Sequence, residues 1–184
     1  MKELSLHILD IAENSVRANA KLIYIYIKED TKKDLLEITI EDDGKGMDEE
    51  VVKIVEDPFY TTRKTRKVGL GIALLKAAAQ RCDGCFEIKS VLNEGTKISC
   101  SFKHSHIDRA PIGNISDTIL ALINKSDHID IMYRHEIDEN IFTFDTRKIK
   151  EMLDGVSLNN YEVIMWIKDY IEENVNSIQN TLNT

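Results

Sequence analysis

The alternation of apolar and polar positions divides the first hundred residues into helices and strands. Leu4, Ile8 and Ile11 recur at helical spacing, whereas Leu36 and Ile38 alternate with polar residues as in a strand. The predicted helices are residues 3–19, 48–56 and 69–82, and the predicted strands are residues 22–28, 35–42, 86–89 and 97–102. This order predicts an α/β two-layer sandwich, with helices on one face of a mixed, mostly antiparallel sheet.

A break in periodicity follows the last of these strands. Residues 105–113 contain Pro111 and Gly113, so we expect residues 1–104 to form one domain that closes its own core. Weaker signals then predict helices near residues 115–124, 146–154 and 160–179, with a hairpin over residues 128–138 and 140–145. Residues 114–184 are therefore expected to be a small α+β segment.

Charge is distributed unevenly over the 184 residues, whose formal net charge is −8. Residues 1–103 hold 17 basic and 18 acidic side chains, and residues 104–184 hold 7 and 14, so the contributions are −1 and −7. The acidic second segment argues against nucleic acid as a partner and favours a protein partner.

Hydropathy and cysteine content indicate where in the cell the protein is expected. No stretch approaches the roughly 18 uninterrupted apolar residues of a membrane helix, so no membrane association is expected. Three cysteines form an odd set in a chain too large to need disulfides, which favours a reducing compartment. The sequence therefore predicts a cytoplasmic protein.

Candidate chemistry begins on the first helix. Asp10, Asn14 and Arg17 are spaced by four and three residues and share one face. A magnesium ion with a triphosphate needs hard oxygen ligands and a nearby positive charge, and an Asn carbonyl oxygen supplies the first without adding negative charge. Taken alone, three such residues also fit an ordinary solvated helix face.

Two glycine-bearing strings follow. In DDGKGM, Asp42 ends a strand, and Gly44 and Gly46 permit a tight turn that an adenine ring can approach. In VGLGIALL, Gly69 and Gly71 stand at a helix start, where free N–H groups and the helix dipole favour phosphate. Either string alone also fits a structural turn. Between them, PFYTTRKTRK is too polar and basic for a core and is predicted to be a lid over phosphates.

The order and spacing of these strings change the interpretation. Together, LSLHILDIAENSVRANA, EDDGKGM, PFYTTRKTRKVGLGIALLKAAA and NEGTKI resemble the GHKL class, the ATPase fold of sensor histidine kinases, anti-sigma factor kinases, gyrase B and MutL. The resemblance covers about residues 1–103. It implies the Bergerat ATP-binding fold, with ATP and Mg²⁺ as cofactors and a flexible lid.

The resemblance also implies roles for single residues, carried over by position. Asn14 resembles the magnesium-binding Asn, Asp42 the adenine-binding Asp, and Asp10 occupies the place of a catalytic Glu that serves as general base. The remaining cofactor-binding positions are Arg17 for phosphates, Gly44, Gly46 and Met47 of the adenine-side turn, Phe59 and Tyr60 as lid anchors, Lys67, Gly69, Leu70 and Gly71 of the phosphate loop, and Thr96 as support for Asp42.

Two residues depart from the family pattern. Asp10 is a methylene shorter than Glu, and Lys67 stands where another glycine is usual. No segment resembles the phosphoacceptor helix pair of sensor kinases, so we expect no self-phosphorylation on histidine by that arrangement. Two functions stay open: a kinase that transfers the γ-phosphate to Ser or Thr of a protein partner in bacterial regulation, and a nucleotide-switched interaction module with slow or no hydrolysis. A second copy of the chain is a further candidate partner.

Overall fold

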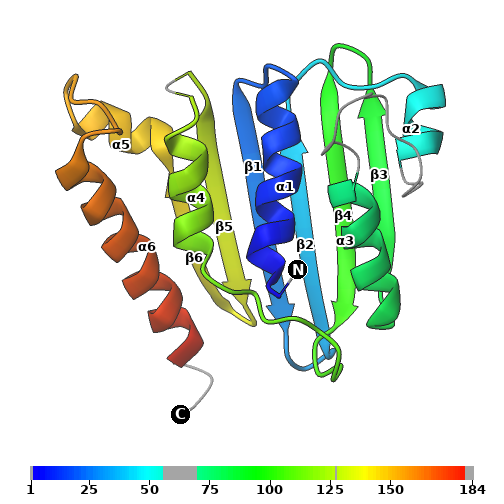
Figure 1. Ribbon diagram of the computed structural model, residues 1–184. Helices are drawn as coiled ribbons and strands as arrows, with labels where there is room; N and C mark the ends of the chain where they lie inside the picture. The colour runs from blue at the N-terminus through cyan, green and yellow to red at the C-terminus, as the bar shows by residue number, and fades with distance from the viewer. Residues whose placement is uncertain (1, 56–69, 127, 181–184) are drawn as a thin grey trace.

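A single sheet with helices packed on it forms the frame of the molecule (Figure 1). The computed structural model describes residues 2–55, 70–126 and 128–180, and within them six strands pair in the order β3-β4-β2-β1-β5-β6. The strands are β1 (Leu22–Asp30), β2 (Leu35–Asp42), β3 (Phe86–Val91), β4 (Gly95–Lys103), β5 (Asp130–Ile137) and β6 (Asn140–Asp145). The helices are α1 (Leu4–Arg17), α2 (Glu49–Val55), α3 (Leu70–Arg81), α4 (Ile115–Ile123), α5 (Thr146–Met152) and α6 (Tyr161–Asn180).

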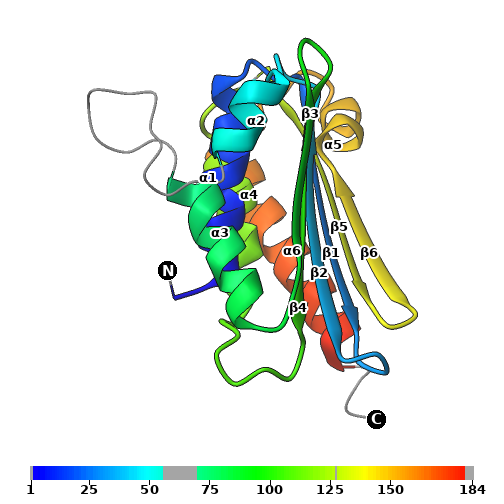
Figure 2. The ribbon, with the colours of Figure 1, turned by 90° about the vertical axis from the view of Figure 1, so that its right-hand side faces the viewer.

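The sheet is mixed, as predicted. β1 pairs antiparallel with β2, and β4 pairs antiparallel with both β2 and β3. On the other side of β1, β5 runs parallel to it and then pairs antiparallel with β6. Seen along its edge, the sheet has α1, α3 and α4 on the same side (Figure 2). The expected two-layer sandwich is therefore confirmed.

The residues of β1 explain why one face of the sheet is covered. Ile23, Ile25 and Ile27 are fully buried beneath the helices, and they alternate with half-buried residues on the opposite face. On that opposite face Tyr24 stacks on Tyr26, with 6.2 Å between their ring centroids. The period of two thus directs aliphatic side chains to the helices and polar-tipped ones outward.

The C-terminal segment belongs to the same sheet and the same core. Leu4 and Ser5 at the start of α1 donate backbone hydrogen bonds to the carbonyls of Pro111 and Ile112, at 2.9 and 2.7 Å. The Thr118 hydroxyl of α4 donates to the Ser5 carbonyl at 3.1 Å. The end of the 105–113 segment is therefore bonded to the start of the first helix. Independent folding of residues 1–104 stays a prediction.

A buried polar chain also joins the two parts of the sequence. The Glu29 carboxylate of β1 accepts hydrogen bonds from Nε2 of His135 on β5, at 2.9 Å, and from Nε2 of His104, at 2.7 Å. The Tyr133 hydroxyl forms a hydrogen bond with Nδ1 of His135 at 2.8 Å. Burial alone would raise the pKa of Glu29, but the bonds from His135 and His104 outweigh it and hold that pKa below its usual range.

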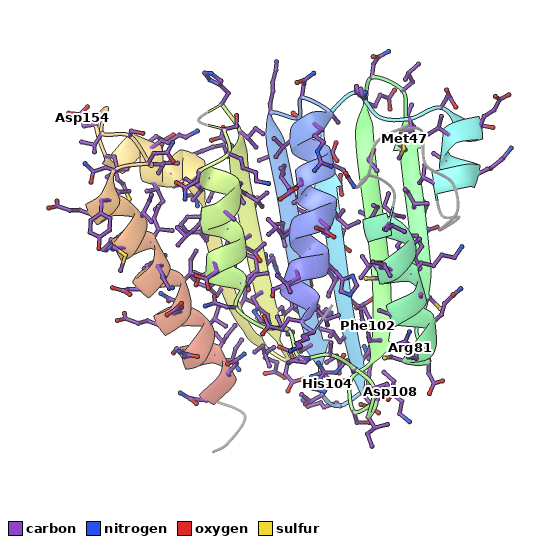
Figure 3. All side chains as sticks on the ribbon, in the orientation of Figure 1. Met47, Arg81, Phe102, His104, Asp108 and Asp154 are labelled. Atoms are coloured by element: carbon purple, nitrogen blue, oxygen red, sulfur yellow. The ribbon has the colours of Figure 1, made fainter. Side chains whose placement is uncertain are left out.

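The two ends of the sheet carry different chemistry. Met47, next to the turn after β2, lies at the upper end in Figure 3, and His104 lies at the lower end. The Glu29 chain is therefore remote from the glycine-bearing turn. Within the described residues, no helix has both the length and the apolar character needed to cross a bilayer.

Candidate functional site

Asp42, the last residue of β2, is fixed by hydrogen bonds from two elements. The Ser15 hydroxyl of α1 donates to Oδ2 at 2.6 Å, and the backbone N–H of Gly44 donates to Oδ1 at 2.9 Å. Ser15 is only 2% exposed, so its hydroxyl has few alternative partners. The carboxylate is therefore oriented before any ligand arrives, and part of its accepting capacity is left for one.

The turn after Asp42 packs closely against the β3–β4 hairpin and the end of α1. Gly46 has a φ of +61°, and a Cβ there would lie 2.0 Å from the Val91 carbonyl oxygen, so a larger residue is excluded. Lys45 N–H donates to the Ala18 carbonyl at 2.9 Å, and Met47 N–H donates to the Ser90 hydroxyl at 2.8 Å. The turn thus connects the end of α1 to the β3–β4 hairpin.

Thr96 has a different partner from the one that the family resemblance implies. Its Cα is the register partner of Asp42 across β2 and β4, but its hydroxyl bonds to the Ser90 hydroxyl at 2.8 Å. The hydroxyl that supports Asp42 comes from Ser15 instead. The Ser90 hydroxyl thus joins Thr96 to the backbone N–H of Met47.

Three predicted residues line one edge of α1. Asp10 and Arg17 are exposed and Asn14 is half-buried. The Arg17 guanidinium donates from Nη1 to Asn14 Oδ1 and from Nη2 to Glu13 Oε2, both at 2.9 Å. Partial loss of hydration, followed by the charge of Glu13, raises the pKa of Asp10 above its usual value. The edge thus presents a carboxylate, an amide oxygen and a cation in one row.

The start of α3 lies against the same edge. A Cβ placed on Gly71 would lie 3.1 Å from the Asp10 Cβ and 3.5 Å from Asp10 Oδ2. The first residue of the helix, Leu70, is exposed beside it. The free N–H groups of a helix start favour phosphate, so Gly71 brings an anion-favouring helix end next to the candidate base.

The oxygen donors present fit a magnesium ion that arrives with a nucleotide. Within the described residues, no group of three or more His, Cys, Asp or Glu side chains is arranged to hold a metal. Magnesium is commonly held by one or two protein oxygens plus phosphates and waters. Asn14 Oδ1, with the Asp10 carboxylate one turn before it, matches that sparse donor set.

The structure does not describe every residue of the predicted site. Phe59, Tyr60, Lys67 and Gly69, with the rest of the predicted lid, lie outside the described residues. The structure thus brings together Asp10, Asn14, Arg17 and Gly71 on facing helices, and places Asp42, Gly44, Gly46, Met47 and Thr96 at the adjoining end of the sheet.

Sequence reasoning missed three supporting residues. Ser15 continues the helical spacing of Leu4, Ile8 and Ile11 and so resembles a member of the apolar stripe of α1. A hydroxyl at a buried helical position is nevertheless a signal of a polar partner. Ser90 gave no signal in the sequence, because its role depends on the tertiary neighbour Met47. Glu13 could have been found, because it stands four residues before Arg17 on the same helix.

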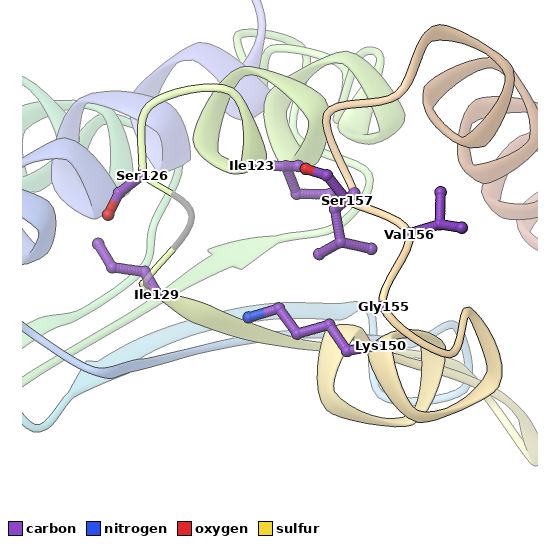
Figure 4. Close-up of a pocket in the computed structure, with 8 residues that line it drawn as sticks. Ile123, Ser126, Ile129, Lys150, Gly155, Val156 and Ser157 are labelled. Carbon is purple, nitrogen blue, oxygen red and sulfur yellow. The ribbon is translucent and has the colours of Figure 1, made fainter.

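Two cavities in other parts of the described structure are not lined by the predicted site residues. One, of about 240 Å³, lies between the end of α4, α5 and the segment before α6 (Figure 4). Ile123, Ile129 and Leu158 line it together with Lys150, whose ammonium pairs with Asp130 at 2.7 Å. A second, of about 320 Å³, lies between Gly113 and the end of α6. The candidate site is therefore the α1–α3 edge and the turn after β2.

Comparisons with known proteins identify the family of the chain. Residues 2–106 match the family model of the histidine kinase-, DNA gyrase B- and HSP90-like ATPases. A probable C4-dicarboxylate sensor kinase of Halalkalibacterium halodurans is 33% identical over 88 residues, which are 48% of this chain and 16% of that protein. The sensor histidine kinase YvrG of Bacillus subtilis is 32% identical over 94 residues, 49% and 16% of the respective chains. The chain thus spans a small fraction of these relatives.

A likeness at the level of fold reaches further along the chain. The crystal structure of the N terminal domain of a DNA repair protein superposes with a TM-score of 0.52 at 13% identity, covering 79% of this chain and 52% of that one. That share exceeds the part taken up by residues 2–106, so the likeness includes some of the C-terminal segment. Because the family model matches more than half of the chain, the chain belongs to the histidine kinase-, DNA gyrase B- and HSP90-like ATPase family.

Proposed function

We propose that the protein binds ATP with Mg²⁺ and transfers the γ-phosphate to a hydroxyl of a protein partner, as a cytoplasmic regulatory kinase. The observation that carries this is the contact of Gly71 with Asp10, which sets an anion-favouring helix start beside a carboxylate. Asp42 supports adenine recognition, because its carboxylate is oriented by Ser15 and Gly44 and can accept the exocyclic amine.

Each residue would have a distinct part in the transfer. Asn14 would hold the metal, which neutralises phosphate charge when bound, and Arg17 would reach the phosphates. The partner's hydroxyl oxygen attacks the γ-phosphorus, the bond from that phosphorus to the ADP oxygen breaks, and the hydroxyl proton passes to the Asp10 carboxylate. The three free thiols support a reducing compartment as the setting.

A second candidate function is a nucleotide-switched interaction module. It is favoured by the Arg17 bond to Asn14 Oδ1, because the amide oxygen that would bind the metal already has a cationic partner. Binding of the metal with ATP would then require Arg17 to leave. Such a movement of Arg17 could change the affinity of the protein for a partner without any hydrolysis of ATP.

Replacement of Asp10 separates the two candidates. As a general base, Asp10→Asn is expected to lower phosphate transfer or ATP hydrolysis by about 10²- to 10⁴-fold, while ATP affinity in calorimetry stays within a few-fold. Because the Asp10 pKa is raised, the fall in rate toward acid pH is expected to begin above the usual titration range of Asp. A wild-type protein that binds ATP but shows no turnover, alone or with lysate proteins as acceptors, would favour the switch.

A further inference from the structure

Lys125, just after α4, contacts the candidate nucleotide site from the C-terminal segment. Its ammonium donates to Oε1 of Glu13, 112 positions earlier in the chain. The other oxygen of that carboxylate accepts from Arg17, and Arg17 donates in turn to Asn14. A continuous chain of charged hydrogen bonds thus runs from Lys125 to the amide oxygen proposed to hold the metal.

We propose that Lys125 is a positioning residue of the nucleotide site, acting through Glu13 on Arg17. The proposal rests on the Mg-ATP function given above. The family match ends at residue 106, so Lys125 belongs to the part of the chain that the family model does not describe. The nucleotide site would then extend beyond the family's own boundaries.

The charges on α1 give Lys125 its effect. Asp10 and Glu13 lie on the edge where the phosphates of ATP are proposed to bind, so two carboxylates oppose an anionic ligand. The ammonium of Lys125 compensates the charge of Glu13 and also acts on Asp10. Without it, Glu13 would hold Arg17 as its sole counter-charge and would repel the phosphates.

The packing of α4 fixes the position of the Lys125 backbone. Ile119 and Leu122 are buried against the core, and Thr118 is bonded to the Ser5 carbonyl of α1. The last turn closes with the Lys125 N–H donating to the Leu122 carbonyl at 3.1 Å. The ammonium therefore comes from a buried helix anchored on α1, even though the side chain itself is partly exposed.

The test replaces the charge and keeps the aliphatic stem. In the full-length protein, Lys125→Met is expected to weaken Mg-ATP binding about twofold to fivefold in calorimetry, the range for one partly exposed ion pair. Mg-ADP, which carries less phosphate charge, is expected to lose less. Lys125→Arg should retain wild-type affinity. Lys168→Met is the matched control, since Lys168 on α6 pairs with Asp117 at 3.0 Å and is in neither the site nor the chain of bonds.

A double-mutant cycle tests the route through Glu13. In a Glu13→Gln background, Lys125→Met should change ATP affinity by less than about 1.5-fold, whereas independent residues would give additive losses. The Lys125 effect should also shrink at about 0.5 M salt. If wild type binds ATP and Arg17→Ala weakens binding but Lys125→Met does not, or if the losses add, the inference is overturned. A wild type that binds no ATP would overturn the proposed function instead.

Discussion

Asp42 is a single residue on which adenine recognition is proposed to depend. Asp42→Asn replaces one carboxylate oxygen with an NH₂ group, which cannot accept a hydrogen bond, so one of the bonds from Ser15 and Gly44 is lost. It also removes the charge that would attract the exocyclic amine. ATP affinity in calorimetry is expected to fall about tenfold to a hundredfold, since hydrogen bonds to charged groups contribute about 1.5–3 kcal/mol.

The neighbouring residue provides the control for Asp42. The Asp43 carboxylate accepts from the N–H groups of Lys21 and Leu22, at 2.7 and 2.9 Å, and so serves the backbone rather than the proposed adenine position. Asp43→Asn should therefore leave ATP affinity unchanged. Equal losses in both variants would show that the turn, and not the Asp42 carboxylate, governs binding.

The choice of partners for single side chains was the least predictable feature. Asp10, Asn14 and Arg17 could be placed on one helix face because helical spacing alone decides that. Support for Asp42 could not be predicted, because Ser15 and Thr96 both carry a hydroxyl and only tertiary packing decides which one reaches the carboxylate.

Helices and strands could be predicted from the sequence where one face of each is buried. The alternation in β1 and β2 matches their burial because one side of each strand meets the helices, and α1 follows its apolar stripe for the same reason. The parallel pairing of β5 with β1 was not predictable. It pairs residues that are 108 positions apart in the chain. The alternation of apolar residues shows which face of a strand is buried but not which strand is its neighbour.

The approach of α3 to α1 gives a prediction at the scale of these elements. Gly71→Ala places a methyl 3.1 Å from the Asp10 Cβ, so the start of α3 must shift by a few tenths of an ångström. The free energy of unfolding should change by less than about 1 kcal/mol, because Ala is the better helix former. ATP affinity should nevertheless fall about tenfold, since positioning at a reacting site is sensitive to small displacements.

A substitution further along the same helix controls for helix propensity. Ala77 on α3 is exposed, so Ala77→Gly weakens the helix without altering its contact with α1. This variant should lose stability in thermal unfolding and keep its ATP affinity. Wild-type affinity in Gly71→Ala would show that the α1–α3 contact is not part of the nucleotide site.

Across the whole molecule, the Glu29 chain makes stability depend on pH. The pKa of Glu29 is lowered by its bonds to His135 and His104, so its contribution is complete above the unfolded-state value of about 4.3 and is lost as pH falls through the folded value. Glu29→Gln is expected to cost about 2 kcal/mol in urea unfolding at pH 7. That difference should narrow below about pH 4.5. Glu37→Gln, on the adjacent strand and the opposite face, should show only a small difference in urea unfolding at pH 7.

Whether the two parts of the chain fold separately is the last prediction, and it concerns the sheet as a whole. The sequence suggests that residues 1–104 close their own core, but the structure pairs β1 with β5 along its length. Removing residues 105–184 would expose Ile23 and Ile25 at a new sheet edge and leave the N–H groups of Leu4 and Ser5 without their carbonyl partners.

We therefore expect residues 1–104 alone to unfold at a much lower temperature than the full chain, with a broad transition in circular dichroism. The apolar area of the core shared with α4 and β5 is lost, and burial contributes about 25 cal/mol per Å². Supplying residues 105–184 as a separate chain should sharpen the transition and restore ATP binding, because the missing partner of β1 returns. A sharp, unshifted transition in residues 1–104 would instead establish that these residues fold autonomously and that the C-terminal strands only dock on a sheet that is already stable.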